Sequence, residues 1–499
     1  MEEPNYWKSI ASLAKLKDFS SKSGVVFGTS GARGLVSEMT SPICVAYCNA
    51  FLEVMATSFK FHTVFIGVDL RPSSLAIAGY CAHAVSLAGF NVEFCGALPT
   101  PALALHSLKQ GQPSIIVTGS HIPFDRNGLK FYRPDGEIAK ADEMLMLGTE
   151  VKFPEESPIK SAESYALPIV NPTAISDYQE RYTDFFSRNL LAGFKLGLYE
   201  HSSVARNVLK RILEVLGAEV VSLARTDIFV PIDTEAVSDH DIALAKAWSS
   251  QYGFDAIIST DGDGDRPLLS DEHGNWLRGD IVGLLCARFL GIQKLAVPIS
   301  CNTAIELSDG FNKVVRTKIG SPYVIAAMQS LQNDDLSVAG FEANGGFLLG
   351  SGVSNTIGVE LSALPTRDAI LPVLAVMASA RQGSIAISDL LLGLPQRYTA
   401  SDRIQNIPAQ LSQKFLTDWA NQPELFCAIL DDEFGVPISK DTTDGLRFTF
   451  EDGVIIHLRA SGNAPELRCY SEASSQGDAH EIVSAVLLKL QTHLLQTSV

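Results

Sequence analysis

From about residue 25 onward the sequence alternates short β-rich runs with longer helical stretches, and this alternation admits few folds. Residues 62–68 (HTVFIGV) predict a strand, residues 73–88 a helix and residues 91–94 the next strand. The same order returns at 195–223 and begins again at 294–299. Strand–helix–strand units of this kind build a mostly parallel sheet with helices on its faces. The sequence therefore predicts an α/β protein whose ligands gather at the carboxyl ends of strands.

The length of the chain indicates several domains. At ~100–200 residues per domain, 499 residues correspond to roughly three or four domains. A stretch at 154–172, rich in Pro, Ser and Glu, is typical of a linker. The C-terminal part differs in pattern, because three predicted strands (447–450, 454–459 and 466–472) precede one helix at 477–495, which indicates an α+β domain. We predict an N-terminal extension at 1–24 and domains at 25–158, 173–292, 293–395 and 396–499.

The N-terminal extension has two readings. Trp7, Ile10, Leu13 and Leu16 recur near helical spacing, which predicts a short docking helix. A partly disordered leader fits the same residues equally well.

The overall charge and the cysteines narrow the class of protein. A net charge of −17 without any Lys/Arg block argues against nucleic acid or an anionic membrane as the main partner. Eight cysteines without a Cys-x-x-Cys pair indicate reduced, structural thiols. The N-terminus lacks a secretory signal pattern, and the longest markedly apolar run, 369–380, is too short to span a bilayer. We expect a cytoplasmic protein that does not enter membranes.

The segment 261–266 (DGDGDR) carries three carboxylates at alternate positions. In extended backbone the side chains of Asp261, Asp263 and Asp265 point the same way, and the intervening glycines let them converge on one ion. Such a cluster suits Mg²⁺, and Arg266 adds a positive charge that could face a phosphate. An EF-hand calcium loop is the rival interpretation, but it requires glycine where Arg266 stands. A solvated acidic turn is the plain alternative.

Ser120 follows a short apolar strand at 114–117 and lies in a tight turn, within 118–123 (TGSHIP). A serine beside a bound cation can carry a phosphoryl group. His121 is its neighbour and Lys130 lies ten residues further on. A Ser-His-Asp hydrolase is the competing hypothesis, but no Gly-x-Ser-x-Gly elbow is present here.

Three further loops offer groups suited to a phosphosugar. Residues 27–34 (FGTSGARG) expose backbone N–H groups beside Arg33, and residues 459–465 (RASGNAP) offer Arg459, Ser461 and Asn463 to a phosphate. Residues 340–346 (GFEANGG) present Glu342 and Asn344, a carboxylate and an amide suited to paired sugar hydroxyls. Each loop alone is also compatible with an ordinary turn. No Walker P-loop is present, which argues against a nucleoside triphosphatase.

Taken together and in this order, the five segments resemble those of the α-D-phosphohexomutase family, and the likeness covers nearly the whole chain after about residue 25. The resemblance implies an α/β fold of three related mixed α/β domains plus a C-terminal α+β domain, arranged around a central cleft. It further implies that a phosphorylated Ser120 exchanges its phosphoryl group with a hexose monophosphate through a hexose 1,6-bisphosphate, which also serves as activator.

The resemblance assigns roles residue by residue. Mg²⁺ would be held by the phosphorylated Ser120 with Asp261, Asp263 and Asp265. Proton transfer and charge stabilisation would involve Lys130 and Arg33, while His121 orients the serine loop and Arg266 faces the phosphate. The sugar hydroxyls would be bound by Glu342 and Asn344. The non-reacting phosphate would be bound by Arg459, Ser461, Gly462 and Asn463.

Departures from the family pattern bear on the substrate. Gly119 and Ile122 stand where members commonly have Ala and Asn, and Asn344, Gly346 and Asn463 replace Ser, His and Thr. Every expected metal ligand is kept. We predict a phosphomannomutase that feeds nucleotide-sugar synthesis, with a phosphoglucomutase or a dual-specificity enzyme as the near alternative and a non-catalytic scaffold as an alternative of another class. We expect the protein to bind small hexose phosphates. We also expect it to be a monomer or a dimer.

Overall fold

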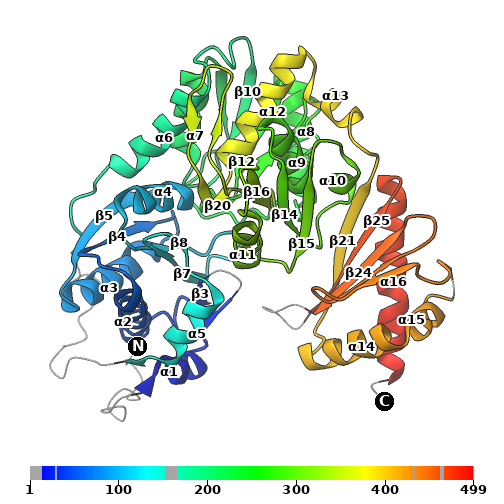
Figure 1. Ribbon diagram of the computed structural model, residues 1–499, viewed down its shortest axis with the longest axis horizontal. Coiled ribbons are helices and arrows are strands. Elements are labelled where there is room, and N and C mark those ends of the chain that lie inside the picture. Colours follow the sequence, from blue (N-terminus) through cyan, green and yellow to red (C-terminus); the bar gives the residue numbers. More distant parts are fainter. Residues whose placement is uncertain (1–13, 29–30, 152–165, 432, 461–465, 498–499) are drawn as a thin grey trace.

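The computed structural model describes residues 14–28, 31–151, 166–431, 433–460 and 466–497. Figure 1 shows four sheet-containing units along an arc, with the two chain ends at the two ends of the arc. The predicted class is confirmed, because helices and sheets are mixed throughout and the last unit differs from the first three.

The first unit contains a seven-stranded mixed sheet in the order β2-β3-β7-β6-β4-β5, with β8 beside β7. The predicted strand at 62–68 is β4, and β4, β5 and β6 are parallel. Helices α2 and α3 pack on one face of this sheet and α4 on the other. The strands are β2 (Val26–Phe27), β3 (Ala32–Leu35), β4 (Thr63–Val68), β5 (Asn91–Ala97), β6 (Ser114–Val117), β7 (Arg126–Arg133) and β8 (Gly136–Glu137), and the helices are α2 (Ser41–Ser58), α3 (Ser74–Leu87), α4 (Thr100–Gln110) and α5 (Lys140–Gly148).

The second unit has a four-stranded sheet and the third a five-stranded sheet. The second comprises α6 (Thr173–Phe185), β10 (Lys195–Tyr199), α7 (Arg206–Val215), β11 (Glu219–Leu223), α8 (Asp239–Tyr252), β12 (Ala256–Thr260) and β13 (Pro267–Leu269). The third comprises α9 (Gly279–Phe289), β14 (Lys294–Pro298), α10 (Ala304–Leu307), β15 (Lys313–Thr317), α11 (Ser321–Leu331), β16 (Val338–Phe341), β17 (Phe347–Leu349), β18 (Val353–Ser354), β19 (Glu360–Leu361), β20 (Leu364–Asp368), α12 (Ile370–Gly383) and α13 (Ile387–Leu392).

These three units repeat one topology. Their sheets contain the orders β5-β4-β6-β7, β11-β10-β12-β13 and β15-β14-β16-β17. In each, three parallel strands are followed by an antiparallel strand that pairs with the third of them. The loop between the third and fourth strands therefore occupies the same position in every unit, at the carboxyl end of a parallel strand.

The fourth unit is an antiparallel five-stranded sheet in the order β21-β25-β24-β23-β22. The three strands and the final helix predicted from the sequence correspond to β23, β24, β25 and α16. The elements are β21 (Tyr398–Gln405), α14 (Ala409–Asn421), α15 (Pro423–Ile429), β22 (Ser439–Asp441), β23 (Leu446–Thr449), β24 (Ile455–Ala460), β25 (Glu466–Ala473) and α16 (Gln476–Thr497).

The described part of the N-terminal extension packs on the first unit. There β1 (Ala14–Lys15) pairs with β9 (Glu150–Val151), and α1 (Leu16–Ser23) packs against α2 through the buried Leu16 and Phe19. Trp7, Ile10 and Leu13, which the prediction of a docking helix also used, lie outside the described residues.

The apolar core joins three units and leaves the fourth separate. One cluster of buried side chains runs from Phe65 in the first unit to Leu394 at the end of the third, whereas the fourth unit has its own cluster. All eight cysteines are buried and none forms a disulfide. Of the helices described, none has both the length and the apolar character that crossing a bilayer requires. The fourth unit is thus the one whose position depends least on a shared core.

Candidate active site

Ser120 lies in the loop between β6 and β7 in a strained backbone conformation. Its φ of 55° is in the left-handed region, which a residue with a Cβ enters at a cost. The side chain is fully buried, and its Oγ donates a 2.6 Å hydrogen bond to Oδ2 of Asp261 in the second unit. The Ser120 N–H donates to the hydroxyl of Thr118 at 2.8 Å. The hydroxyl is therefore held in one orientation, against a carboxylate.

Arg71, a buried arginine that the sequence did not single out, supports the loop that carries Ser120. The guanidinium of Arg71 donates to the backbone carbonyls of residues 120, 122, 123 and 126. Asp69 pairs with Arg71 and also accepts the hydroxyl of Thr118 at 2.8 Å. A Cβ on residue 119 would stand 2.5 Å from Cζ of Arg71, so a larger residue there would make the guanidinium shift. Asp69 and Arg71, which follow β4, were the only sequence signal for this support.

The acidic loop between β12 and β13 lies against the serine loop. Carboxylate oxygens of Asp261, Asp263 and Asp265 are within 4.8 Å of one another, and all three side chains are buried. Gly264 has a φ of 71°, which permits the turn between the second and third carboxylates. Burial, followed by the charges of Asp263 and Asp265, raises the pKa of the Asp261 carboxyl well above its usual range. Such mutual repulsion is what a bound cation would relieve.

Two basic side chains partly neutralise the acidic loop. Lys130 on β7 donates to Oδ2 of Asp263 at 2.6 Å and to Oδ2 of Asp265 at 2.7 Å. Arg367 on β20 pairs with Asp265 at 3.0 Å. Burial disfavours the charged form of Asp263, but the Lys130 ammonium outweighs it and holds the pKa of that carboxyl well below its usual range. The Oδ1 atoms of Asp263 and Asp265 are buried without a hydrogen-bond partner among the described residues, which suits oxygen ligands of a divalent cation.

Positive side chains surround the serine on its other sides. Nη1 of Arg266 donates to Nδ1 of His121 at 2.5 Å, while the Ser120 Oγ lies 3.5 Å from the same nitrogen. Burial and the charge of Arg266, then that of Arg33, hold the pKa of His121 well below its usual range, so the imidazole is neutral. Burial and the charges of Arg266 and Arg367 lower the pKa of Arg33 to about 10. Cations crowded together in this way favour an anion in their midst.

The loop between β16 and β17 is joined to the acidic loop by Arg367. Its Nη1 donates to Oε1 of Glu342 at 3.1 Å, so one guanidinium bridges Asp265 and Glu342. Oδ1 of Asn344 accepts the N–H of Gly346 at 3.0 Å, and its backbone carbonyl accepts the Thr234 hydroxyl. Arg367 was missed from the sequence, although the polar triplet 366–368 before the apolar helix α12 is a signal that could have flagged it.

The structure thus brings most of the predicted site residues together. The serine loop, the acidic loop and the loop between β16 and β17 are the equivalent loops of the three repeated units, and they meet through Ser120–Asp261, Lys130–Asp263 and Asp265–Arg367–Glu342 contacts.

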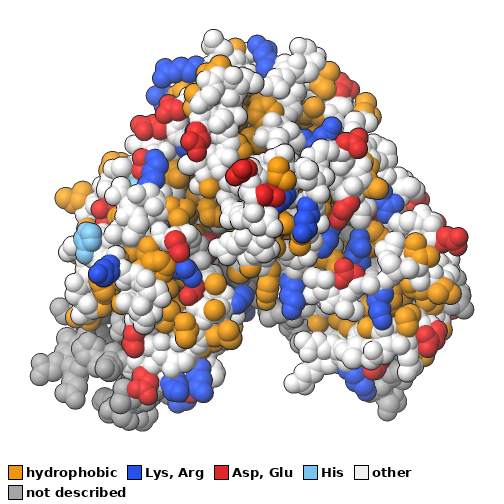
Figure 2. Space-filling model, in the orientation of Figure 1, with side chains coloured by type: hydrophobic (Ala, Val, Ile, Leu, Met, Phe, Trp, Pro, Cys, Tyr) orange, Lys and Arg blue, Asp and Glu red, His pale blue; other side chains and the backbone are white. Residues whose placement is uncertain are grey.

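Arg459 lies apart from this group, at the end of β24 in the fourth unit. Its Nε contacts Oδ2 of Asp444 at 3.1 Å, and it is in register with Arg468, which is in register with Arg403. Ser461, Gly462 and Asn463 lie outside the described residues. Figure 2 shows the surface hollowed between the first unit and the fourth, with Lys and Arg side chains on the rim of the hollow.

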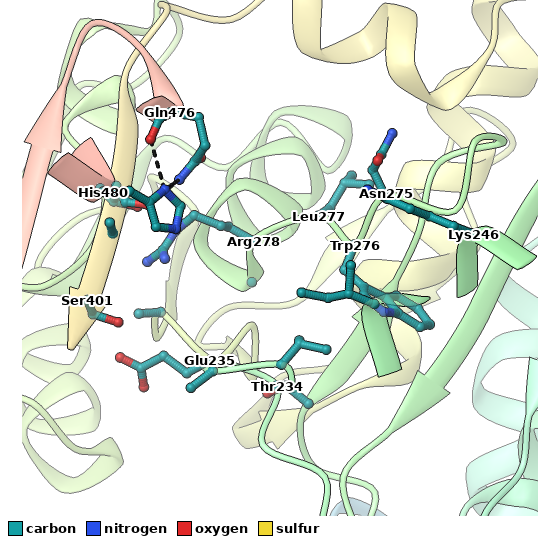
Figure 3. A pocket seen from close by; sticks show the side chains of 17 residues that line it. Thr234, Glu235, Lys246, Asn275, Trp276, Leu277, Arg278, Ser401, Gln476 and His480 are labelled. Atoms are coloured by element: carbon teal, nitrogen blue, oxygen red, sulfur yellow. Dashed lines mark hydrogen bonds between the residues drawn. The ribbon is translucent and has the colours of Figure 1, made fainter. Parts of the chain in front are cut away.

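A cavity of about 420 Å³ lies where the second, third and fourth units meet. Its lining includes Ala343 of the loop between β16 and β17, Glu235 and Arg278, and, from the fourth unit, Ser401 and His480. Figure 3 shows His480 hydrogen-bonded to Gln476, with Glu235 and Ser401 among the other side chains around the cavity.

The site suits phosphoryl groups for two reasons. Its guanidinium and ammonium groups can neutralise the negative charge of a phosphoryl group, and its oriented hydroxyl can bond to one covalently. The fold and the site define a phosphotransferase.

Comparison with known protein families agrees with a phosphotransferase. Models of phosphoglucomutase/phosphomannomutase domains I, II, III and IV match residues 24–153, 176–274, 278–398 and 419–489 in order. The chain belongs to the phosphoglucomutase/phosphomannomutase family and is an isomerase that acts as an intramolecular phosphotransferase.

Curated relatives and solved structures extend the likeness over the whole chain. A phosphomannomutase of Salmonella muenchen is 49% identical over 96% of this chain and 98% of its own length. A phosphomannomutase of Sinorhizobium fredii is 43% identical over 95% of this chain and 100% of its own. A phosphoglucomutase/phosphomannomutase family protein of Burkholderia thailandensis shares the fold at a TM-score of 0.69 and 19% identity, covering 93% of this chain and 97% of its own.

Proposed function

We propose that the protein interconverts mannose 6-phosphate and mannose 1-phosphate through a phosphorylated Ser120 and a hexose 1,6-bisphosphate. The observation that carries the proposal is the 2.6 Å hydrogen bond from the Ser120 hydroxyl to Asp261, inside a cluster that combines three carboxylates with arginines and a lysine. Two phosphomannomutases above 40% identity favour mannose as the sugar. A fungal mutase with a related fold, 14% identical at a TM-score of 0.59, is described in complex with glucose 1,6-bisphosphate, which favours that type of intermediate.

The acidic loop fits a magnesium ion. Asp261, Asp263 and Asp265 would hold Mg²⁺ together with an oxygen on Ser120, and the Oδ1 atoms of Asp263 and Asp265, which have no hydrogen-bond partner among the described residues, are of the type this ion prefers. When bound, Mg²⁺ supplies neutralising charge for the transferring phosphoryl group. Lys130 pairs with two of these carboxylates, Asp263 and Asp265, so a cation bound there would share them with the lysine.

The transfer itself exchanges one phosphorus–oxygen bond for another. The free hydroxyl of the hexose monophosphate attacks the phosphorus on Ser120, the bond to the Ser120 Oγ breaks, and the hydroxyl proton passes to a base. Lys130 is the candidate for this proton transfer, and it can accept the proton only as the neutral amine; Arg33 and Arg266 stabilise the charge on the phosphoryl oxygens. His121, which is neutral and hydrogen-bonded to Arg266, orients the serine loop rather than acting as the base.

The second half-reaction returns the other phosphate of the intermediate to Ser120, so the sugar must turn around within the cleft. One phosphate site has to accept either end of the sugar, and Arg459, Ser461, Gly462 and Asn463 are proposed to form it. Glu342 and Asn344 are proposed to hold the sugar hydroxyls, with Glu342 oriented by Arg367. Approach of the fourth unit, which has its own core, would exclude water during this step.

The proposal is tested by following mannose 1-phosphate, glucose 1-phosphate and glucosamine 1-phosphate to their 6-phosphates with Mg²⁺ and a trace of hexose 1,6-bisphosphate. A clear kcat/KM preference for mannose is the expected result. Comparable mannose and glucose values would replace the proposal with a dual phosphomannomutase/phosphoglucomutase. Release of inorganic phosphate would favour a hydrolase, and failure to isomerise any of the three would leave the scaffold hypothesis.

A further inference from the structure

A second group of metal-ligating side chains lies in the first unit, on β5 and α4. Glu93, Cys95 and His106 each offer one ligand atom, and these three atoms lie within 4.8 Å of one another. The set is chemically unlike the acidic loop, because it supplies a sulfur, a nitrogen and an oxygen.

Strand alternation places Glu93 and Cys95 on one face of β5, because side chains two residues apart point to the same side. Ile66 on β4 pairs with Phe94 and the next residue, Gly67, pairs with Gly96, so the register of the strand shifts only at Cys95. Phe94 belongs to the apolar cluster on one face of the sheet, whereas Cys95 belongs to the cluster on the α4 face. Cys95 is fully buried there, on the same side as Glu93 and the His106 ring.

The His106 ring is oriented by a carboxylate from another unit. Its Nδ1 lies 3.1 Å from Oδ2 of Asp177 on α6, and its Nε2 lies 3.4 Å from Oε1 of Glu93. A carboxylate on one ring nitrogen is the usual partner of a metal-binding histidine, since it keeps the proton on that nitrogen and leaves a lone pair on the other. Lys109 pairs with the other oxygen of Asp177 at 3.0 Å and balances its charge.

Spacing and charge fit a tetrahedral ion of the zinc type. Metal–ligand bonds of about 2.0–2.3 Å separate neighbouring ligands by roughly 3.3–3.8 Å. Nε2 of His106 and Oε1 of Glu93 already lie 3.4 Å apart, so any remaining approach is that of the Cys95 sulfur. Oε1 of Glu93 also accepts a 2.6 Å hydrogen bond from Nδ2 of Asn171, which holds this oxygen beside the imidazole ring. One thiolate and one carboxylate would neutralise a divalent ion, and a borderline-soft ion favours sulfur and imidazole over the all-oxygen loop.

We propose that Glu93, Cys95 and His106 bind one Zn²⁺ ion, with water in the fourth position and Asp177 as a positioning residue. On binding, the sulfur–hydrogen bond of Cys95 breaks, its proton leaves to solvent and a metal–sulfur bond forms. Because His106 is tied to Asp177 on α6, the ion stiffens the junction between the first unit and the helix that leads into the second.

Cobalt titration of the full-length protein tests this site, because a cobalt–thiolate bond gives a near-ultraviolet charge-transfer band that the sulfur-free acidic loop cannot give. Saturating Mg²⁺ occupies the acidic loop during the titration. The expected result is a band that saturates at one equivalent of Co²⁺ and is displaced by Zn²⁺. Cys95→Ser abolishes it, whereas Cys469→Ser, a matched control at a fully buried strand cysteine in the fourth unit, retains it.

Two further variants separate ligation from folding. Glu93→Gln keeps the thiol and should weaken cobalt binding, and Asp177→Asn should weaken it about 10–100-fold without removing the band. A merely structural ion pair between Asp177 and His106 would leave cobalt affinity unchanged. Absence of the band in the unmodified protein, or its survival in Cys95→Ser, overturns the proposal. Mannose phosphate isomerisation plays no part in the readout, so the outcome is independent of the proposed function.

Discussion

Replacing Ser120 by alanine and, separately, by glycine distinguishes the chemistry of its hydroxyl from the strain of its backbone. Both variants lose the 2.6 Å hydrogen bond to Asp261, which removes a donor from a buried carboxylate and costs about 1–3 kcal/mol of stability. Alanine keeps the strain of a φ of 55°, worth about 1–2 kcal/mol, whereas glycine does not. Glycine's greater entropy in the unfolded chain offsets part of this relief of strain, so we expect the glycine variant to be more stable than the alanine variant by only about 1 kcal/mol.

Activity should not follow this order. If Ser120 carries the phosphoryl group, both variants lose isomerisation by at least about 10³-fold, although one is more stable than the other. Urea unfolding in a chelator measures the stability difference, and conversion of mannose 1-phosphate with Mg²⁺ measures activity. Either variant retaining activity within about tenfold of the unmodified enzyme would refute the phosphoserine assignment. Equal stabilities of the two variants would show that the strain at residue 120 is no larger than the entropy that glycine gains in the unfolded chain.

Three other substitutions test the surroundings of the site and the fourth unit. Lys130→Met leaves Asp263 and Asp265 without their ammonium partner and should lower the free energy of unfolding in a chelator by about 3–5 kcal/mol. Added Mg²⁺ should restore part of this loss, which thermal unfolding with and without Mg²⁺ measures. An equal loss under both conditions would contradict cation binding at these carboxylates. Arg71→Lys keeps the charge, but the lysine cannot donate to all four backbone carbonyls, so kcat should fall with little change in KM. An unchanged kcat would mean that the serine loop does not need the hydrogen bonds of Arg71. Burial lowers the pKa of His457 to about 4, so between about pH 6.5 and pH 4 the unfolded chain takes up a proton that the folded chain does not, and stability falls by up to about 3 kcal/mol as the pH drops. His457→Gln should flatten this pH dependence in denaturant unfolding, and an equally steep loss in the variant would exclude His457 as its source.

Much of the local structure was predictable because its causes are local. The strands at 195–199 and 219–223 and the helix at 206–216 follow from periodic apolar residues, and the structure places β10, β11 and α7 there. The nature of the acidic loop was equally predictable, since three carboxylates separated by single glycines have few other uses. The order of five motifs carried the family resemblance.

The partners of the supporting side chains were not predictable. The sequence shows Arg71 and Arg367 only as polar residues near strand ends, because 49 residues separate Arg71 from its carbonyl acceptor at Ser120 and 102 separate Arg367 from Asp265. The cluster of Glu93, Cys95 and His106 likewise forms only in the folded chain, where α4 brings His106 to β5 and Asp177 comes from a helix of the next unit.

By itself, the sequence determined which chemical groups are available, where each short strand delivers them and which family the order of motifs resembles. Only the tertiary structure decided that the serine loop, the acidic loop and the loop between β16 and β17 occupy the same position in three repeated units and meet through Ser120, Asp261, Asp265 and Glu342. The physical reason is the sequence separation over which each kind of interaction acts. Periodicity and turn chemistry act over a few residues, whereas the 2.6 Å contact between Ser120 and Asp261 joins positions 141 residues apart and exists only because two sheets pack with their strand ends together.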